Sequence, residues 1–430
     1  MTGGTVHVVG AGVAGLSAAV RLIDAGAKVV VHEAARAAGG RCRSYYDQSL
    51  GLVIDNGNHL LLSGNAAALD YLSRVGGIGA LQGPPAPVFD FADLGTGERW
   101  RIRPNAGRIP WWLLDRSRRA PGTSLREHFA PLATFFAPAA ATLGETMSCK
   151  GPLYDRLWRP LLLAGLNTEP PEGSAALAAA MLRETLGAGG RACRPLIAAQ
   201  GLSQAFVDPA IGFLEARGAT VRFGRRLRGV TFVGARAVEL DFEAEKLALG
   251  PGDAAVVAVP PWIARELLPD IEAPDEFRAI VNAHFRIAPP PQQPAILGVV
   301  NSLTEWLFAY PDRLSTTISG ADRLLERPRE DLAAEIWREV AALTGLPAAM
   351  PAWQIVKEKR ATFAATPAQN AKRPPSRTRW DNVALAGDWT QTSLPATLEG
   401  AVRSGYTAAL ILTGKRDGAP KSRLALGVSP

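Results

Sequence analysis

The chain has 430 residues, 47% hydrophobic and 20% charged, which is typical of a globular protein with room for two substantial subdomains and excludes a disordered one. Its net charge of +7 favours anionic surfaces, but no basic-aromatic recognition motif accompanies the charge, so nucleic acid is not expected as a partner. Three cysteines and five histidines show neither metal-ligand spacing nor a disulfide framework, which predicts a reduced cytoplasmic protein without a metal.

The first sixty residues predict a dinucleotide site. An apolar strand at 6–9 leads into a glycine turn at 10–15, a helix over 16–23 and a second apolar strand at 28–32. This order gives the G-x-G-x-x-G pattern its meaning, because glycine-rich turns alone are common. The glycines let the backbone approach a pyrophosphate, and an acid after the second strand binds a ribose hydroxyl. The candidate cofactor residues here are Gly10, Gly12, Ala14, Gly15, Glu33 and Ala34.

Two short segments downstream favour a flavin over a nicotinamide. The double glycine of 38–41 again lets backbone pass close to a ligand, and its arginine can meet phosphate oxygens with a planar fork. The segment 54–59 is expected near the redox ring. Both contribute candidate cofactor residues: Gly39, Gly40 and Arg41 from the first, and Gly57, Asn58 and His59 from the second.

The middle of the chain predicts a change of architecture. A proline-rich break at 84–87 precedes a hairpin over 88–102 with its turn at 93–97, and 124–186 has helical spacing rich in Ala and Leu. We interpret that stretch as a helical insertion on the substrate side.

Two apolar stretches with tryptophan, 109–114 and 157–166, are open to two interpretations; Arg116, Arg118 and Arg119 follow the first, and an arginine lies within the second. Such a composition suits a membrane interface, but a core segment capped by solvated arginines is favoured. No run of about 18 apolar residues predicts a membrane-spanning helix. Met1–Gly4 leads at once into the first strand, so no targeting segment is expected.

Further elements are expected in the second half. A helix opens at 201–206, strands follow at 219–223, 227–233 and 254–260, and 289–294 is a loop between strands of a second sheet. An amphipathic helix covers 329–344, and the basic tail after Gly414 is expected to be loose.

Near the C-terminus a short strand, 383–386, ends in Gly387 and Asp388. A turn and a helix with small residues on one face follow over 394–405, with Pro395, Ala396 and Thr397 at the helix start. The positive end of that helix dipole could hold the electron-rich part of an isoalloxazine ring.

An N-terminal glycine loop combined with a C-terminal Gly-Asp strand and helix resembles the flavin-dependent amine oxidase and phytoene desaturase superfamily. Segments 55–65, 358–367 and 386–400 are similar to the hydroxysqualene dehydroxylase family, the squalene-associated FAD-dependent desaturases of hopanoid pathways. The resemblance implies non-covalent FAD, with the backbone near Leu227 meeting the adenine; an ordinary core leucine is the equal alternative. It also implies an isoprenoid lipid substrate, squalene-pathway enzymes as partners, and a cytoplasmic location at the inner face of the membrane.

We therefore expect an α/β protein, with a Rossmann-type (GR2-like) FAD-binding domain and a second domain of mixed sheet and helices. The expected FAD-binding parts are 1–80, 201–265 and 361–415; the substrate parts are the helical insertion 81–200 and the sheet 266–360, and 416–430 is a loose tail.

The sequence shows no nucleophile elbow and no thiol poised beside a partner, so the cofactor is expected to carry the difficult step. The resemblance implies removal of the hydroxyl of hydroxysqualene, giving squalene. His59 is the candidate proton donor if its pKa stays near neutral, although a histidine that fixes backbone is favoured. Arg360 lines the pocket or, as favoured, has a structural or solvated role.

Three other functions remain open. A carotenoid-type polyene desaturase shares the fold. A flavin amine oxidase is a weaker alternative, because this sequence shows no recognisable aromatic pair that could cage an amine. A non-catalytic prenyl-lipid carrier would have an eroded flavin motif, and the motif here is complete.

Overall fold

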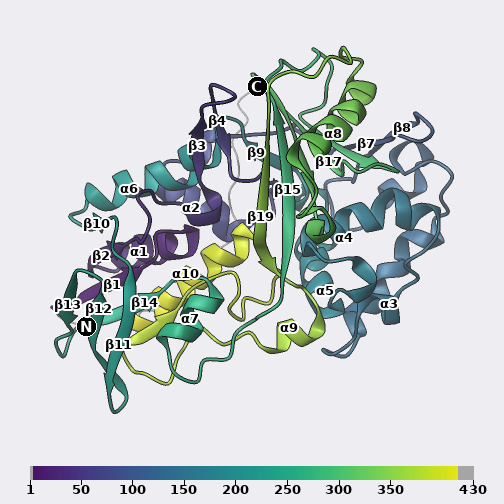
Figure 1. The fold of residues 1–430 in the computed structure, drawn as a ribbon. Helices are drawn as coiled ribbons and strands as arrows, with labels where there is room; N and C mark the ends of the chain where they lie inside the picture. The colour runs from purple at the N-terminus through teal and green to yellow at the C-terminus, as the bar shows by residue number, and fades with distance from the viewer. Residues whose placement is uncertain (1–2, 415–430) are drawn as a thin grey trace, which may run out of the picture.

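The computed structural model describes residues 3–414. Its first layer is a five-stranded parallel sheet, seen at the left of Figure 1. In spatial order the strands are β10 (Thr220–Arg222), β2 (Lys28–His32), β1 (Thr5–Val9), β14 (Ala254–Val257) and β20 (Val383–Leu385). The three middle strands are largely apolar because both faces of the sheet are covered, as in other parallel sheets. The sheet therefore joins four segments that are distant in the sequence.

Helices cover one face of this sheet and a small antiparallel sheet covers the other. The helices are α1 (Val13–Asp24), α2 (Ala66–Val75), α6 (Asp208–Glu215) and α10 (Leu398–Thr413), which share one hydrophobic cluster with the sheet. The opposite face packs against β11 (Leu227–Val233), β12 (Arg236–Phe242), β13 (Glu245–Ala248) and α7 (Pro261–Leu267). Helices α1 and α10 pack closely because Gly405 has no side chain: a Cβ there would lie 2.3 Å from the carbonyl oxygen of Ala14.

The second layer is a mixed seven-stranded sheet. Its spatial order is β19 (Trp353–Phe363), β15 (Phe277–Phe285), β18 (Arg313–Ile318), β17 (Trp306–Tyr310), β16 (Ile296–Val300), β7 (Phe89–Asp93) and β8 (Arg99–Ile102). Only the pair β16–β7 is parallel. Helix α8 (Arg329–Thr344) covers one face, where Trp337 packs against Phe285 with ring centroids 5.1 Å apart. The long strands β15 and β19 run through the middle of the molecule in Figure 1.

Short helices cover the other face of the seven-stranded sheet, at the right of Figure 1. They are η3 (Trp111–Leu114), η4 (Arg116–Arg118), η5 (Arg126–Phe136), α3 (Leu143–Thr146), α4 (Arg159–Leu166) and α5 (Ala175–Glu184). The predicted helical stretch 124–186 is thus confirmed as helical but broken, and prolines inside it, such as Pro131 and Pro138, interrupt helix hydrogen bonding. Within the part of the chain that the structure describes, no helix is long and apolar enough to cross a bilayer.

Smaller elements connect the two layers. A hairpin is formed by β3 (Ser44–Asp47) and β4 (Leu52–Asp55), a three-stranded sheet by β5 (Leu61–Leu62), β9 (Pro195–Ala198) and β6 (Leu81–Gln82), and α9 (Pro367–Ala371) follows β19.

Several predicted elements are confirmed. The hairpin at 88–102 is β7–β8, the strand predicted at 227–233 is β11, and the amphipathic helix at 329–344 is α8. The helix expected from 201 starts as a π-turn, Ser203–Val207, that continues into α6. The tail after Gly414 lies outside the described residues.

Candidate functional site

The glycine turn after β1 has the geometry that a dinucleotide requires. Gly10 has a φ of +106°, and a Cβ on Gly15 would lie 1.9 Å from the carbonyl oxygen of Gly10, so the turn needs glycine at both positions. Gly12 is different, because nothing lies within 4 Å of the position that its Cβ would take. Gly12 is also the N-cap of α1 and provides no side-chain cap. The open space and the uncapped helix start fit a pyrophosphate group. Ala14 is buried in the first turn of that helix.

The carboxylate of Glu33 is fixed beside this turn. Its Oε2 accepts a hydrogen bond from the backbone N–H of Ala11 at 2.8 Å, and its Oε1 accepts one from Ala35 at 2.7 Å. The backbone N–H of Arg225 donates to the carbonyl oxygen of Glu33 at 2.8 Å, which brings the start of β11, with Leu227, to the end of β2. Leu227 is itself buried opposite Phe242. Ala34, which follows Glu33 in the sequence, is exposed.

Arg41 joins the two ends of the chain. Gly39 (φ +106°) and Gly40 (φ +56°) carry the backbone past Gly12, and the N–H of Gly39 donates to the carbonyl oxygen of Ala11 at 2.8 Å. The guanidinium of Arg41 then pairs with the carboxylate of Asp388 at 2.7 Å. The structure therefore brings together the N-terminal glycine motifs and the C-terminal Gly-Asp motif, more than 340 residues apart in the sequence.

The loop that follows the C-terminal strand β20 depends on a buried arginine. Arg373 is almost fully buried and donates hydrogen bonds to the carbonyl oxygens of Asp388 (3.0 Å), Leu394 (2.8 Å) and Thr390. Burial lowers the pKa of Arg373 to about 10, so the side chain remains a cation at neutral pH. This clamp shapes the whole 388–394 loop. Sequence reasoning missed Arg373, because a charged residue before two prolines reads as a surface turn.

The same loop leads to the start of α10. Thr397 is the N-cap, and its hydroxyl accepts a hydrogen bond from the N–H of Gly400 at 3.0 Å. Pro395 is buried and Ala396 half-buried just before it. The N–H of Gly387 donates to the hydroxyl of Ser404 at 2.8 Å, which fixes the end of β20 on the helix. The predicted helix start at the C-terminal motif is thus confirmed.

Asn58 lies where the parallel sheet meets the seven-stranded sheet. Its amide nitrogen donates to the hydroxyl of Thr317 at 3.0 Å, and its amide oxygen accepts from the hydroxyl of Tyr310 at 3.2 Å. Asn282 accepts from Thr317 at 2.8 Å and lies against Gly57, where an added Cβ would be 3.2 Å from its amide nitrogen. That buried nitrogen has no partner. An asparagine inside the apolar run of β15 was the signal in the sequence that could have identified it.

The pKa of His59 lies well below that of a free imidazole. Burial and the nearby Arg41 cation lower the pKa of His59 to about 4, against the opposing effect of Asp388. The imidazole is therefore neutral at physiological pH. This observation favours a role in hydrogen bonding beside the site over a role as general acid.

A small cavity lies next to the Arg41–Asp388 pair. Arg41 and Asp388 line one side, and Trp262, Phe277 and Arg360 line another. The guanidinium of Arg360 lies 4.6 Å from the centre of the Trp262 ring, and the two aromatic rings meet edge-on with centroids 5.1 Å apart. Arg360 therefore lines the pocket, with its cation against the rings of Trp262 and Phe277.

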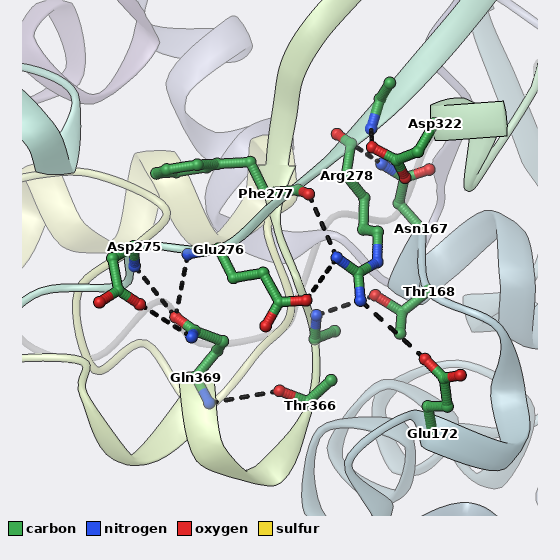
Figure 2. A network of polar contacts seen from close by, with 12 residues as sticks. Asn167, Thr168, Glu172, Asp275, Glu276, Phe277, Arg278, Asp322, Thr366 and Gln369 are labelled. Carbon is green, nitrogen blue, oxygen red and sulfur yellow. Dashed lines mark hydrogen bonds and ion pairs between the residues drawn. The ribbon is translucent and has the colours of Figure 1, made fainter. Parts of the chain in front are cut away.

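The helical segment is fixed to β15 and β19 by a polar network, shown in Figure 2. Asn167, at the end of α4, donates to the hydroxyl of Thr362 at 3.0 Å and accepts from the N–H of Gly320 at 2.7 Å. Arg278, near the start of β15, pairs with Glu276 at 2.7 Å and approaches Glu172 at 3.9 Å. The network holds the short helices against the strands that face the site.

Comparison with known proteins agrees with this geometry. A model of the flavin containing amine oxidoreductase family matches residues 13–412. The structure resembles putrescine oxidase (TM-score 0.68, 18% identity, 96% of this chain and 99% of that one). It also resembles a putative protoporphyrinogen oxidase from Exiguobacterium (TM-score 0.66, 16% identity, 97% and 100%). At these identities the likeness shows the fold, an FAD-binding α/β domain with a second domain. The chain is thus an FAD-dependent oxidoreductase of the flavin amine oxidoreductase class.

The sequence relatives narrow the class. A hydroxysqualene dehydroxylase of Rhodopseudomonas palustris is 57% identical over 96% of this chain and 99% of its own length. Those of Sinorhizobium fredii and Zymomonas mobilis are 53% and 45% identical, each over 94% of this chain and 97% of their own length. The chain belongs to the hydroxysqualene dehydroxylase family.

Proposed function

We propose that this protein binds FAD without a covalent link and removes the allylic hydroxyl of hydroxysqualene, giving squalene for hopanoid biosynthesis. The observation that carries the proposal is the near-full-length similarity to three relatives of that name. The complete set of cofactor motifs supports it, because a lipid carrier without redox chemistry has no need of the Gly12 opening and the Arg41–Asp388 pair. We further propose a cytoplasmic protein that receives its substrate from the preceding enzymes of squalene synthesis.

Different candidate residues would hold different parts of the cofactor. The turn from Gly10 to Gly15 and the start of α1 would hold the pyrophosphate, Glu33 a ribose, and the chain near Leu227 the adenine. Arg41, Asp388 and the Thr397-capped start of α10 would hold the flavin end. Reduced flavin, when bound, supplies a hydride.

The proposed reaction consumes one hydride and one proton and releases one water. The allylic C–O bond breaks, the hydroxyl leaves as water with an added proton, and a hydride forms the new C–H bond at the same carbon. His59 at neutral pH is a hydrogen-bonding group, so we assign it the positioning of groups beside the cofactor. The unpaired amide nitrogen of Asn282 and the hydroxyl of Tyr310, both near Asn58, are further polar groups at this junction. Phe363 and Trp389, two buried side chains that line the cavity, would help to exclude bulk water from the cation that follows water loss.

Arg360 bears on the alternative of amine oxidation. Its guanidinium lies on the face of Trp262 and 5.6 Å from the centre of Phe277, and the two rings meet edge-on, so they do not form the facing pair that would cage a substrate amine. A lipid substrate makes no such demand.

The test is an anaerobic single turnover. Photoreduced holoenzyme is mixed with hydroxysqualene in deuterated water, and flavin reoxidation is followed together with product mass. Because the flavin N5 hydrogen exchanges with solvent, squalene with one deuterium at the former carbinol carbon is expected. Desaturation by the oxidised enzyme, with no reaction of the reduced enzyme, would instead support the polyene desaturase.

The same preparation tests the cofactor link. Acid precipitation should release FAD into the supernatant, since the three cysteines, at 42, 149 and 193, lie outside the C-terminal flavin segment. Flavin that remains in the pellet would contradict a non-covalent site.

A further inference from the structure

Exposed apolar side chains gather on one segment, 109–136. Of the thirteen large hydrophobic side chains exposed among the described residues, seven belong to it, and Phe136 (89% exposed) and Trp111 (63%) are among the most exposed. We call these seven side chains the apolar patch: Ile109, Trp111, Leu114, Leu125, Phe129, Leu132 and Phe136. The second apolar stretch of the sequence, 157–166, is different, because its large apolar side chains are mostly buried.

The patch is part of an ordered surface. Trp112, next to the exposed Trp111, is buried and meets the buried ring of His128 edge-on, with centroids 5.8 Å apart. This contact joins η3 to η5. The indole N–H of Trp158 also donates to the carbonyl oxygen of Glu127 at 3.4 Å. The outward apolar side chains are thus carried by two segments whose inward side chains are packed together.

The charge around the patch is positive. Residues 103–136 contain six arginines and only two acids, Asp115 and Glu127, which leaves a net charge of +4 out of +7 for the chain. Both acids are engaged locally: Asp115 accepts from the N–H of Ser117 at 2.9 Å, and Glu127 from the N–H of Ser124 at 2.6 Å. Exposed arginines, among them Arg108 and Arg116, flank the patch.

We propose that the apolar patch and its arginines dock the protein onto the surface of a bilayer that contains anionic phospholipid. Exposed tryptophan, phenylalanine and leucine enter the boundary between headgroups and acyl chains, and the arginines meet the phosphates. A second copy of this chain is a poor occupant, since a symmetric contact would bring the two sets of arginines together.

Docking at this place deepens the proposed function, on which this step rests. The buried hydrophobic cluster that contains Trp112 and Leu113 also contains Leu162, Trp306 and Tyr310. Tyr310 donates to Asn58 beside the cofactor site. The docked segment and the Tyr310–Asn58 contact are therefore built on one hydrophobic core, so docking at the patch would bring the bilayer to the substrate side of the molecule.

The experiment measures partition of the FAD-loaded protein to vesicles of phosphatidylcholine with and without phosphatidylglycerol. We expect flotation that requires the anionic lipid and weakens at high salt. The double variant Trp111→Ser/Phe136→Ser should bind at least about tenfold more weakly, because each large side chain loses its burial in lipid. The variant Arg116→Gln/Arg126→Gln should lose the dependence on anionic lipid. Brominated lipid should quench tryptophan fluorescence less in Trp111→Phe than in the wild type.

Matched controls use exposed residues elsewhere: Phe223→Ser/Val233→Ser for the apolar change and Arg217→Gln/Arg265→Gln for the charge. Equal losses in patch and control variants, or no flotation at any composition, would overturn the proposal. If the wild-type protein does not float but forms a dimer that the patch variant abolishes, the patch is a protein interface and the docking proposal is wrong. Turnover of hydroxysqualene in detergent micelles separates the docking proposal from the proposed function, because the patch variant should retain this turnover. A protein that binds vesicles but shows no turnover would refute the proposed function and leave the docking proposal standing.

Discussion

In the parallel sheet, the groups that approach the cofactor site are placed mainly by backbone geometry, whereas on the seven-stranded sheet they are placed by contacts among side chains. Gly10, Gly12 and Gly15 act through the absence of a Cβ and the positive φ of the first. Asn58, Asn282 and Tyr310 act through a chain of amides and hydroxyls. The difference teaches that the first region is specified by a few local positions, and the second by partners that only the folded chain brings together.

The largest effect should come from glycine. Gly15→Ala should leave little folded flavoprotein, because its Cβ would lie 1.9 Å from a backbone oxygen and the turn cannot yield; we expect a loss of about 3 kcal/mol or more. Gly12→Ala is the control that sharpens the comparison. It should fold normally and lose FAD affinity, since its methyl group enters open space. Thermal unfolding and FAD titration measure the two effects, and equal stability of both variants would contradict the backbone account.

The Arg373 clamp tests the side-chain mechanism inside the cofactor region itself. Arg373→Met should cost about 1–3 kcal/mol, because at least three buried carbonyl oxygens lose their donor. Urea unfolding measures the loss, and limited proteolysis should then cut within 388–394. The exposed Arg379→Met is the control. A clamp variant as stable as this control would show that the loop holds its shape unaided.

Glu33→Ala should weaken FAD binding by roughly ten- to hundredfold, the value of a charged hydrogen bond to a ribose. Folding should change less, because Glu33 is only half-buried and its present partners are the backbone N–H groups of Ala11 and Ala35. FAD titration of apo-protein is the measurement. Unchanged affinity, with a loss of stability instead, would make Glu33 a structural brace of the turn.

The smallest effect concerns Glu305, at the edge of β17. Burial raises the pKa of Glu305 from its ordinary 4.5 to about 7, although the N–H of Ser319 donates to its carboxyl at 2.7 Å. A raised pKa means that the folded chain holds the proton more tightly, so this contribution to stability is complete below pH 4.5 and is lost as the pH rises through about 7.

Glu305→Gln should therefore stabilise the protein at pH 8 by about 1–3 kcal/mol and change little at pH 4.5. Melting temperatures at both pH values measure this, with the exposed Glu272→Gln as control. A gain that is the same at both pH values would rule out titration as the cause.

The two regions also differ in what the sequence could predict. The glycine turns, Glu33 and the Gly387–Asp388 motif were expected as cofactor residues, since each belongs to a local pattern of strand, turn and helix. The pair between Arg41 and Asp388 is visible only in the folded chain. The helix 329–344 and the hairpin 88–102 follow from periodicity and are confirmed. The partners Asn282 and Tyr310 were not foreseen, because they reach Asn58 across more than 200 residues of sequence. Arg373 was not foreseen either, because its contacts, 15 to 21 residues away, form only when the 388–394 loop folds around a buried cation.

The apolar stretches 109–114 and 157–166 show that a sequence pattern alone does not predict whether a segment is buried. Both combine tryptophan and leucine, with arginines just after the first stretch and within the second, yet Trp111 is exposed and Trp158 is buried. Composition indicates that a segment is more stable in an apolar environment than in water. It does not say whether the rest of the chain or another phase provides that environment.

The order of strands in the parallel sheet has a consequence for biosynthesis. Strand β1 lies in the middle of the sheet and is made before β14, which pairs with it, and long before β20 and the covering helix α10. The glycine turn therefore emerges long before Asp388 can pair with Arg41. Contacts of such sequence separation close late, and until then the apolar strand β1 is exposed. A nascent chain of this kind must keep its first strand from pairing wrongly in the meantime, and we expect it to retain its flavin only after α10 has been made.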